Sequence, residues 1–462
     1  MAQSNAVFLE GNLFRHISVM SLTASLGLMA VFLVDFVDMI FISMLGKAEL
    51  AAAVGYAGAI LFFTSSFGIG MSIAAGALVA RALGGGDESG ARMKATTALA
   101  YGFAFGAVFA AIVWFNLGFL VTLMGASGET HDLAVGYLQI IIPSLPLLLI
   151  GMVGGAIRRA HGAARRAMYA TIIGGLVNAV LDPILIFGLG LDLTGAALAS
   201  VAARAAIAAT ALLPIFRHHG GLEAPRADHM LPDLRPLAAI AAPAILTQLA
   251  TPVGQAFVTR SMAEYGEDAV AGMAIVARLT PVAFGVIFAL SGAVGPIIGQ
   301  NAGAGDRDRV RGAFRAALLF TALYVVAAAL LLFLLRAPIA AMFDATGQAL
   351  ALVYLFCGPL ALVFFFNGTL FVANAAFNNL RQPLRSTWLN WGRHTLGTVP
   401  PVLLLSAWLG APGVLIGQAV GGVVFGLIAW RLAERLISAP DLPRPEPERF
   451  RTRLFQLLHH RR

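Results

Sequence analysis

Two acidic residues, Asp35 and Asp38, lie inside an apolar run that extends from Leu26 to Leu45. Because residues at i and i+3 share one helical face, the two carboxyl groups would lie side by side in apolar surroundings. A carboxylate at the middle of a bilayer costs about 2.5–3.5 kcal/mol even on insertion scales. We therefore expect a coupled pair that shares one proton over much of the accessible pH range. The alternative is a structural role, with one acid bonded to a helix carbonyl or hydroxyl.

A second polar group consists of Asn178 and Asp182, which are followed directly by Pro183. The i,i+4 spacing places the amide and the carboxyl on one helical face. Proline has no amide hydrogen, so it frees the carbonyl of Ala179 and usually kinks the helix. Carboxylate, amide and carbonyl oxygens are the hard ligands that Na⁺ or a proton relay would use. The alternative is a proline kink that contains one satisfied acid.

The composition of the chain is that of a membrane protein. Of its 462 residues 59% are hydrophobic and only 12% are charged, whereas soluble domains carry roughly 25% charged residues. Apolar stretches of about 20 residues, long enough to span a bilayer, recur twelve times. The expected spans are 16–45, 50–80, 95–123, 131–157, 167–190, 194–216, 234–262, 269–299, 311–342, 348–377, 386–409 and 412–433.

The formal charge of +8 would also suit a protein that binds nucleic acid. The basic residues, however, are grouped after every second span, for example Arg158 and Arg159 after the fourth and Arg307 and Arg309 after the eighth. By the positive-inside rule, both termini and the even-numbered loops are expected to be cytoplasmic. We therefore expect a multi-pass protein of the bacterial inner (plasma) membrane. Its expected partner is the lipid bilayer, and it is not expected to bind nucleic acid.

The chain contains two similar halves. GALVARALGGGD at 76–87 resembles GPIIGQNAGAGD at 295–306, an offset of 219 residues. MGASG at 124–128 resembles FDATG at 343–347 at the same offset, and LDPIL at 181–185 resembles VPPVL at 399–403 at an offset of 218. Six spans in each half give both copies the same polarity, so they are expected to be parallel repeats about an axis along the membrane normal.

We therefore expect an all-α polytopic membrane protein with twelve transmembrane helices in two six-helix lobes related by a pseudo-twofold axis. The expected units are an N-terminal lobe (1–216), a polar cytoplasmic linker (217–235), a C-terminal lobe (236–437) and a basic cytoplasmic tail (438–462). The apolar start of the chain, with Phe8, Leu9, Leu13 and Phe14, is expected to lie along the membrane interface. Two lobes around a central axis favour a transporter with alternating access over an enzyme, and a monomer suffices because the duplication supplies both lobes.

The second half lacks the acids of the first, since Pro400 and Val258 stand at the positions that correspond to Asp182 and Asp38. If an ion drives transport, its site is therefore expected in the first lobe. The polar residues of the second lobe are weaker candidates for a substrate cavity: Gln248, Gln255, Arg278 and Asn374. Arg204 and Arg278 could bind an anion or pair with an acid, whereas such arginines more often extend their head groups to the interface or cap helix ends.

Four motifs resemble those of the multidrug and toxic compound extrusion (MATE) family, and the similarity covers essentially the whole chain. They are VDFVDMIFISMLG at 34–46, NAVLDP at 178–183, GAALAS at 195–200 and GQNAGAGD at 299–306. Because its second lobe lacks these acids, the chain resembles the branch that contains the DNA-damage-inducible (DinF-type) proteins and archaeal relatives. The resemblance implies an antiporter that is coupled to H⁺ or Na⁺, has no other cofactor, and exports a small molecule, here a lipophilic and often cationic compound.

The resemblance also implies a cation site, Na⁺ included, at Asp38, Asn178, Asp182 and Ser200. Ser200 replaces a more usual threonine and keeps the oxygen ligand. Asp35 is an addition to the pattern, and it could hold a second proton or contact a cationic substrate. The alternative function is a lipid-linked saccharide flippase of a neighbouring family. Such proteins tend to have extra spans and several cavity arginines, and this chain offers only two.

Overall fold

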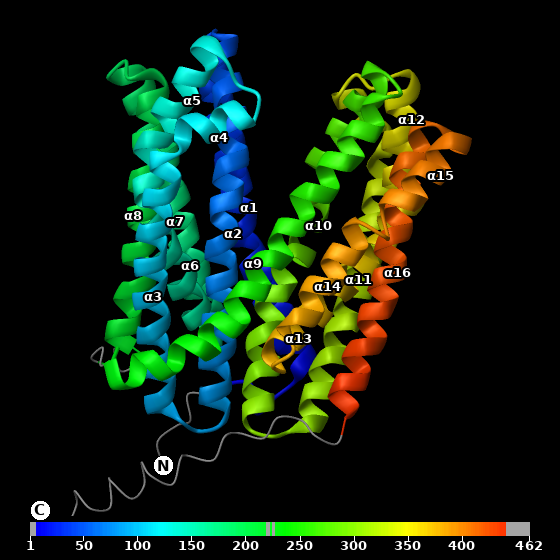
Figure 1. Cartoon of the computed structure of the whole chain (residues 1–462). Coiled ribbons are helices and arrows are strands. Elements are labelled where there is room, and N and C mark those ends of the chain that lie inside the picture. Colours follow the sequence, from blue (N-terminus) through cyan, green and yellow to red (C-terminus); the bar gives the residue numbers. More distant parts are fainter. Residues whose placement is uncertain (1–5, 219–221, 224–226, 440–462) are drawn as a thin grey trace, which may run out of the picture.

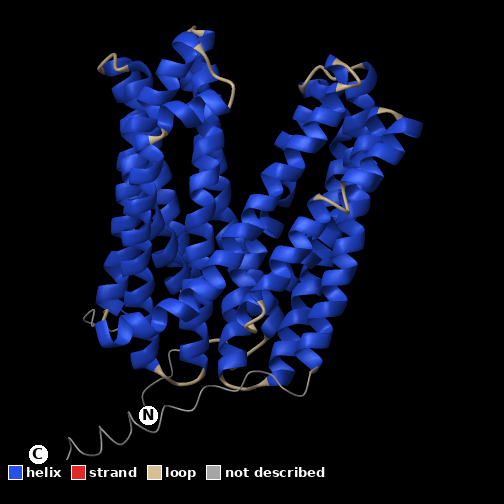
Figure 2. Cartoon of the chain, in the orientation of Figure 1, coloured by secondary structure: helices blue, strands red, loops and turns tan. Residues whose placement is uncertain are grey.

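The computed structural model describes residues 6–218, 222–223 and 227–439, and within these ranges every regular element is a helix (Figure 2). The first half contains α1 (Leu13–Met44), α2 (Ala48–Gly84), α3 (Glu88–Phe115), α4 (Leu117–Leu123), α5 (Gly128–Ile141), η1 (Ile142–Ser144), α6 (Leu145–Ala160), α7 (Ala164–Pro183), η2 (Ile184–Gly188) and α8 (Asp192–His218). The second half contains α9 (Ala227–Ala263), α10 (Glu267–Gly303), α11 (Arg307–Met342), α12 (Gly347–Leu355), η3 (Phe356–Leu360), α13 (Ala361–Asn379), α14 (Pro383–His394), α15 (Val399–Leu409) and α16 (Ala411–Ser438).

In the described part of the chain, 11 helical segments are long and apolar enough to cross a membrane. The expected span 386–409 is not a continuous helix, which corrects that prediction: a turn at 395–398 separates α14 from α15. Pro400 and Pro401 at the start of α15 cannot donate to the hydrogen-bond ladder of a continuing helix. The expected span 95–123 is likewise divided, between α3 and α4 at Asn116. The general expectation of an all-α, multi-pass protein is met.

The helices form two bundles that lie close together at one end and diverge toward the other (Figure 1). We call the joined end, where the α2–α3 and α10–α11 loops lie, the lower end. The duplication is visible in the backbone. Gly125 and Asp344 are 219 positions apart and both have positive φ angles, 96° and 49°, and Gly128 and Gly347 follow with 59° and 50°. The two halves therefore repeat the same turn before α5 and α12.

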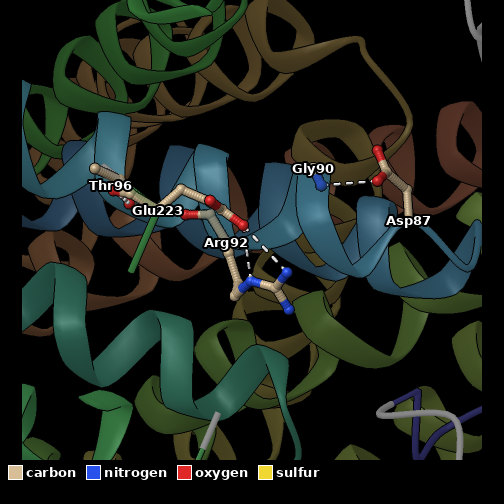
Figure 3. A network of polar contacts seen from close by, with 5 residues as sticks. All are labelled: Asp87, Gly90, Arg92, Thr96 and Glu223. Carbon is tan, nitrogen blue, oxygen red and sulfur yellow. Dashed lines mark hydrogen bonds and ion pairs between the residues drawn. The ribbon is translucent and has the colours of Figure 1, made fainter. Parts of the chain in front are cut away.

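The connection between the bundles is fixed to α3 (Figure 3). Arg92 Nη2 lies 3.1 Å from Glu223 Oε1, and the Thr96 hydroxyl donates to the Glu223 carbonyl at 3.1 Å. Within the expected linker 217–235, α8 continues to His218 and α9 already begins at Ala227. The lobe boundaries remain predictions. Residues 219–221 and 224–226 of the linker, and 440–462 of the expected tail, lie outside the described residues.

At the lower end the two bundles touch backbone to backbone, where α2 packs against α10. Gly84 and Gly303, which are 219 positions apart, are the last residues of these helices. A Cβ atom on Gly84 would overlap the carbonyl of Gln300, and a Cβ on Gly303 would overlap that of Arg81. Arg81 and Gln300 are themselves 219 positions apart. Each contact is therefore the repeat-related copy of the other.

Two hydrogen bonds extend this reciprocal contact. Arg81 Nη2 donates to the Asn379 carbonyl at the end of α13, at 2.7 Å. Gln300 Nε2 donates to the Ala160 carbonyl at the end of α6, at 2.8 Å. The two donors are 219 positions apart, and so are the two acceptors. Each bundle therefore donates a hydrogen bond to a helix end of the other bundle. We call the two glycines and these two bonds the lower junction.

The residues before α1 add a further contact, to the ends of α10 and α11. The Phe8 N–H donates to Gln300 Oε1 at 2.9 Å, and the Phe8 carbonyl accepts from Arg309 Nη2 at 2.9 Å and from Asn301 Nδ2 at 3.2 Å. The Phe8 side chain is only 2% exposed. The expectation that Phe8 lies at the membrane interface is wrong, because the polar ends of α10 and α11 satisfy its backbone and allow its ring to be buried.

Alanine at Gly84 or Gly303 is expected to destabilise the protein by about 1–3 kcal/mol, because the added methyl group must displace packed backbone. Gly58 is the control, since a Cβ there meets no atom within 4 Å, and alanine is the better helix former. Thermal unfolding of the purified variants in detergent measures the difference. A Gly84→Ala protein as stable as Gly58→Ala would contradict the close contact.

Candidate cation site

The centre of the candidate site is a contact between α1 and α7, which carry Asp38 and the pair Asn178 and Asp182, respectively. With its NH₂ group turned toward the carboxylate, Asn178 Nδ2 donates to Asp38 Oδ1 at 2.9 Å and lies 3.2 Å from Oδ2. The opposite orientation would place the amide oxygen against two carboxylate oxygens, all of them acceptors. Asn178 is 3% exposed, so this contact lies inside the bundle.

The Asp182 carboxyl faces Asp38 within hydrogen-bonding reach. Asp182 is fully buried, and no donor in the described part of the chain reaches either of its oxygens. Two ionised carboxylates cannot bond to each other, because both are acceptors only. Their contact becomes attractive only when a proton or a cation lies between them. The arrangement can therefore take up one positive charge.

Pro183 ends α7 directly after Asp182, and the chain continues through the π-helical turn η2. Proline cannot donate to the carbonyl of Ala179 one turn earlier. The Leu189 N–H then bonds the Ile184 carbonyl at 2.9 Å, the wider i→i+5 spacing. Such π turns are frequent at functional sites. The proline motif thus produces a local widening of the helix, where the sequence indicated only a kink.

Tyr137 is a site residue that sequence reasoning missed. Its hydroxyl lies within hydrogen-bonding reach of Ser200 on α8, and it interacts electrostatically with both Asp38 and Asp182. The side chain is 9% exposed. Ser200 is therefore joined to the carboxyl pair through Tyr137. The only sequence signal for Tyr137 was a hydroxyl within an apolar span, which spacing alone cannot connect to residues on other helices.

Asp35 occupies a different position from that expected. Its side chain on α1 is exposed, and its charge acts on Asp38 from one turn away. The carboxyl that faces Asp38 belongs to Asp182, so the Asp35–Asp38 pairing expected from their spacing is corrected. Residues at i and i+3 lie on one broad face of a helix. A neighbouring helix packs against only part of that face. A role for Asp35 in cation binding remains a prediction.

Within the described residues, no hydrogen bond joins the four weaker candidates of the second bundle to one another. Gln255 accepts a hydrogen bond from Gln418 Nε2 at 3.3 Å, between α9 and α16. Asn374 is 6% exposed and accepts from Asn390 Nδ2 at 3.2 Å, between α13 and α14. Gln248 is half-buried on α9, and Arg278 is exposed on α10. A role of these four residues in a substrate cavity remains a prediction.

Two repeated bundles with a buried carboxyl pair in only one of them have the organisation of a secondary transporter. The family model MatE matches residues 24–184 and 243–400. The chain therefore belongs to the MatE family of transporters, as its motifs indicated. It is a multi-pass membrane transporter and not an enzyme.

Among curated proteins, the chain is 29% identical over 430 residues to an FAD transporter of Shewanella oneidensis, covering 90% of this chain and 93% of that protein. It is 24% identical over 436 residues to the multidrug export protein MepA of Staphylococcus haemolyticus, with 93% and 96% covered. Both alignments extend across the two bundles.

The solved structures agree on the fold. A mutant of the Vibrio cholerae MATE transporter VcmN superposes with a TM-score of 0.88 at 22% identity, covering 93% of this chain and 98% of that one. An outward-facing multidrug resistance MATE family transporter gives a TM-score of 0.87 at 22% identity, with 95% and 99% covered. The all-α fold predicted from the sequence is thereby confirmed.

Replacing Asn178 by leucine is expected to destabilise the protein by about 1.5–3 kcal/mol, because it leaves the Asp38 carboxylate without its donor. In an Asp38→Leu background the same replacement should lower stability far less. The double-mutant cycle isolates the contact, with thermal unfolding in detergent as the measurement. Losses that simply add in the double variant would show that the two side chains do not interact.

Proposed function

We propose that the protein is a cation-coupled antiporter that exports small organic compounds. The observation that carries this proposal is the buried Asp182 carboxylate, which faces Asp38 and has no donor within the described residues. Uptake of one positive charge removes the repulsion across the α1–α7 contact. A ligand drives a conformational change only if it binds one arrangement better than the other, and this contact provides that difference.

The proposed coupling ion is the proton. Two facing carboxyl groups need only one proton to form a hydrogen bond. A Na⁺ ion would need further oxygen ligands, which Asn178, Ser200, Tyr137 and the freed Ala179 carbonyl could add, and the Asn178 amide would have to turn its oxygen inward. The geometry therefore favours H⁺ over Na⁺.

We place the lower end in the cytoplasm of a bacterial cell, with the chain in the inner membrane and both termini inside. The supporting observation is that the arginine-rich loops after α2, α6 and α10 lie at this end, as the positive-inside rule requires. The bundles are joined there and diverge at the opposite end (Figure 1). This arrangement is outward-facing, and the lower junction must separate for the inward-facing one to form.

We also place the chain in the DinF-type branch, because its second bundle carries no carboxylate inside its apolar spans. The proposed substrates are lipophilic cations, which the exposed Asp35 on α1 could attract. The similarity to MepA supports this class. A flavin dinucleotide is a second candidate, because the FAD transporter of Shewanella oneidensis is similar across 90% of the chain and Arg278 is an exposed cation on α10. The saccharide flippase has no comparable support.

Asp38→Asn and Asp182→Asn are expected to reduce proton-driven export at least tenfold in proteoliposomes, because an amide cannot take up and release the coupling proton. Asp192→Asn, at the half-buried start of α8, is the matched control and should transport normally. The assay imposes a pH gradient with and without a Na⁺ gradient. Equal transport by all variants would overturn the proposed site, and transport driven by Na⁺ alone would overturn the choice of ion.

The two substrate classes predict opposite variant effects. Asp35→Asn should weaken the apparent affinity for a lipophilic cation such as ethidium by roughly three- to tenfold and spare FAD, since only the cation is attracted to a carboxylate. Arg278→Gln should weaken FAD transport and spare ethidium. Arg260→Gln, an exposed arginine at the end of α9, is the control for general charge loss. Absence of FAD transport by the wild-type protein would eliminate the dinucleotide candidate.

A further inference from the structure

A cavity lies outside the cation site, at the lower end of the second bundle. It has a volume of about 230 Å³ and lies between the first turns of α11 and the last turns of α16. A single water needs only about 10–15 Å³ of such space, so the cavity has room for a much larger group. Its lining includes three arginines, one acid and two buried apolar side chains: Arg311, Arg315, Arg435, Glu434, Phe314 and Ile437.

The arginines of this cavity are only partly neutralised. In the described part of the chain, neither Arg315 nor Arg435 has a hydrogen-bond acceptor or a carboxylate partner. Arg311 Nη1 lies 3.1 Å from Asp308 Oδ1, but the Asp308 side chain is 91% exposed, and such exposed ion pairs contribute little. Three arginines against Asp308 and Glu434 leave the cavity with a net positive charge.

The duplication allows this cavity to be compared with the first bundle. Asp87 and Asp306, which are 219 positions apart, cap α3 and α11 in the same way. Each side chain accepts a hydrogen bond from the backbone N–H three residues later, at 2.7 and 2.9 Å. The two helices therefore begin in the same register, and Arg92 of α3 corresponds to Arg311 of α11.

The first bundle binds an anionic group at this position (Figure 3). Arg92 Nη2 lies 3.1 Å from Glu223 Oε1, and the Thr96 hydroxyl donates to the Glu223 carbonyl at 3.1 Å. Thr96 corresponds to Arg315, again 219 positions apart. Helix α11 thus carries a second arginine where α3 carries a hydroxyl. The same place in the second bundle is therefore the more positive of the two.

The helices of the cavity also carry exposed apolar side chains. Arg315 shares one face of α11 with the exposed Leu319, one turn further along. Arg435 shares one face of α16 with the exposed Ile428 and Val424, two and three turns before it. Both helices are long and apolar enough to cross a membrane, so acyl chains cover these faces. A ligand with its head group in the cavity can extend its chains along them.

We propose that the cavity between α11 and α16 binds the phosphate head group of an acidic phospholipid, whose acyl chains lie along the exposed apolar faces of these helices. Guanidinium groups bind phosphate oxygens through paired, charge-assisted hydrogen bonds. Basic pockets between membrane-spanning helices on the cytoplasmic side bind such head groups, and the lower end is the proposed cytoplasmic side. The inference goes beyond the proposed transport function, because it depends on neither the coupling ion nor the transported compound.

The experiment titrates the full-length protein in detergent with phosphatidylglycerol and measures binding by native mass spectrometry. Arg315→Gln and Arg435→Gln should each weaken binding about fivefold, the factor that corresponds to about 1 kcal/mol for each arginine near a membrane surface. The double variant should lose about 25-fold if the two effects add. Phosphatidylcholine has the same phosphodiester but no net charge, and it should bind weakly to all of these proteins.

The matched control is the double variant Arg165→Gln/Arg166→Gln, which removes two exposed arginines from the start of α7 at the same end of the protein. It should bind phosphatidylglycerol as the wild type does. An equal loss in this control would show a general effect of surface charge and would overturn the proposed site. Unchanged binding in the Arg315/Arg435 double variant would overturn it as well, and would leave these arginines to solvent or to acids of the chain itself.

Thermal unfolding distinguishes the lipid from free phosphate, since both could contact the same arginines. Phosphatidylglycerol should raise the unfolding midpoint of the wild type and of the Arg165/Arg166 control, and much less that of the Arg315/Arg435 double variant, because a ligand stabilises the state that binds it. Inorganic phosphate at the same ionic strength should not reproduce this shift, since it has no chains to bury. An equal shift with inorganic phosphate alone would overturn the lipid as the ligand.

Discussion

The approach of the Asp38 and Asp182 carboxyl groups inside a membrane-spanning bundle is the interaction on which the rest of the structure depends. In surroundings of low dielectric, the repulsion between two carboxylates is several times stronger than in water. Apolar packing alone cannot hold them together, so the neighbouring polar groups are arranged to make the pair tolerable. Asn178 donates to one carboxylate, and Tyr137 links the pair to Ser200. The remaining deficit is one positive charge, and in the proposed mechanism its uptake changes the α1–α7 packing.

Much of this site could be predicted from the sequence, because helix periodicity is a local property. The spacing of Asn178 and Asp182 before Pro183 places both residues on one face of α7. The position of Asp38 in an apolar run identifies it as a candidate. The sequence does not show which carboxyl group faces Asp38. That choice depends on how α1 and α7 pack, so the nearby Asp35 was paired wrongly. Tyr137 was missed for the same reason, since its partners lie on other helices.

The fold shows the same limit. Hydropathy recognises spans by their average apolar character and located most of the membrane segments, whereas the duplication was found from repeated motifs. It cannot detect a helix that stops and restarts within equally apolar sequence, as at the turn 395–398 before Pro400. Nor does it separate a residue buried between helices from one at the lipid interface. Phe8 is buried because Gln300 and Arg309 satisfy its backbone, and these partners are roughly 300 positions away.

The two bundles share a backbone arrangement, but the buried acids differ between them. In the proposed mechanism, this combination lets cation uptake at one site move both bundles. The carboxyl pair exists only in the first bundle, whereas the lower junction is reciprocal: Gly84 and Gly303 each contact the backbone of the other bundle. Backbones in direct contact cannot slide past each other without a clash, so the bundles must part at this junction before they can rearrange. Helix α1, which carries Asp38, also packs against α10 and α11 of the second bundle. In the proposed mechanism, a change in the α1–α7 contact therefore acts directly on the interface between the bundles.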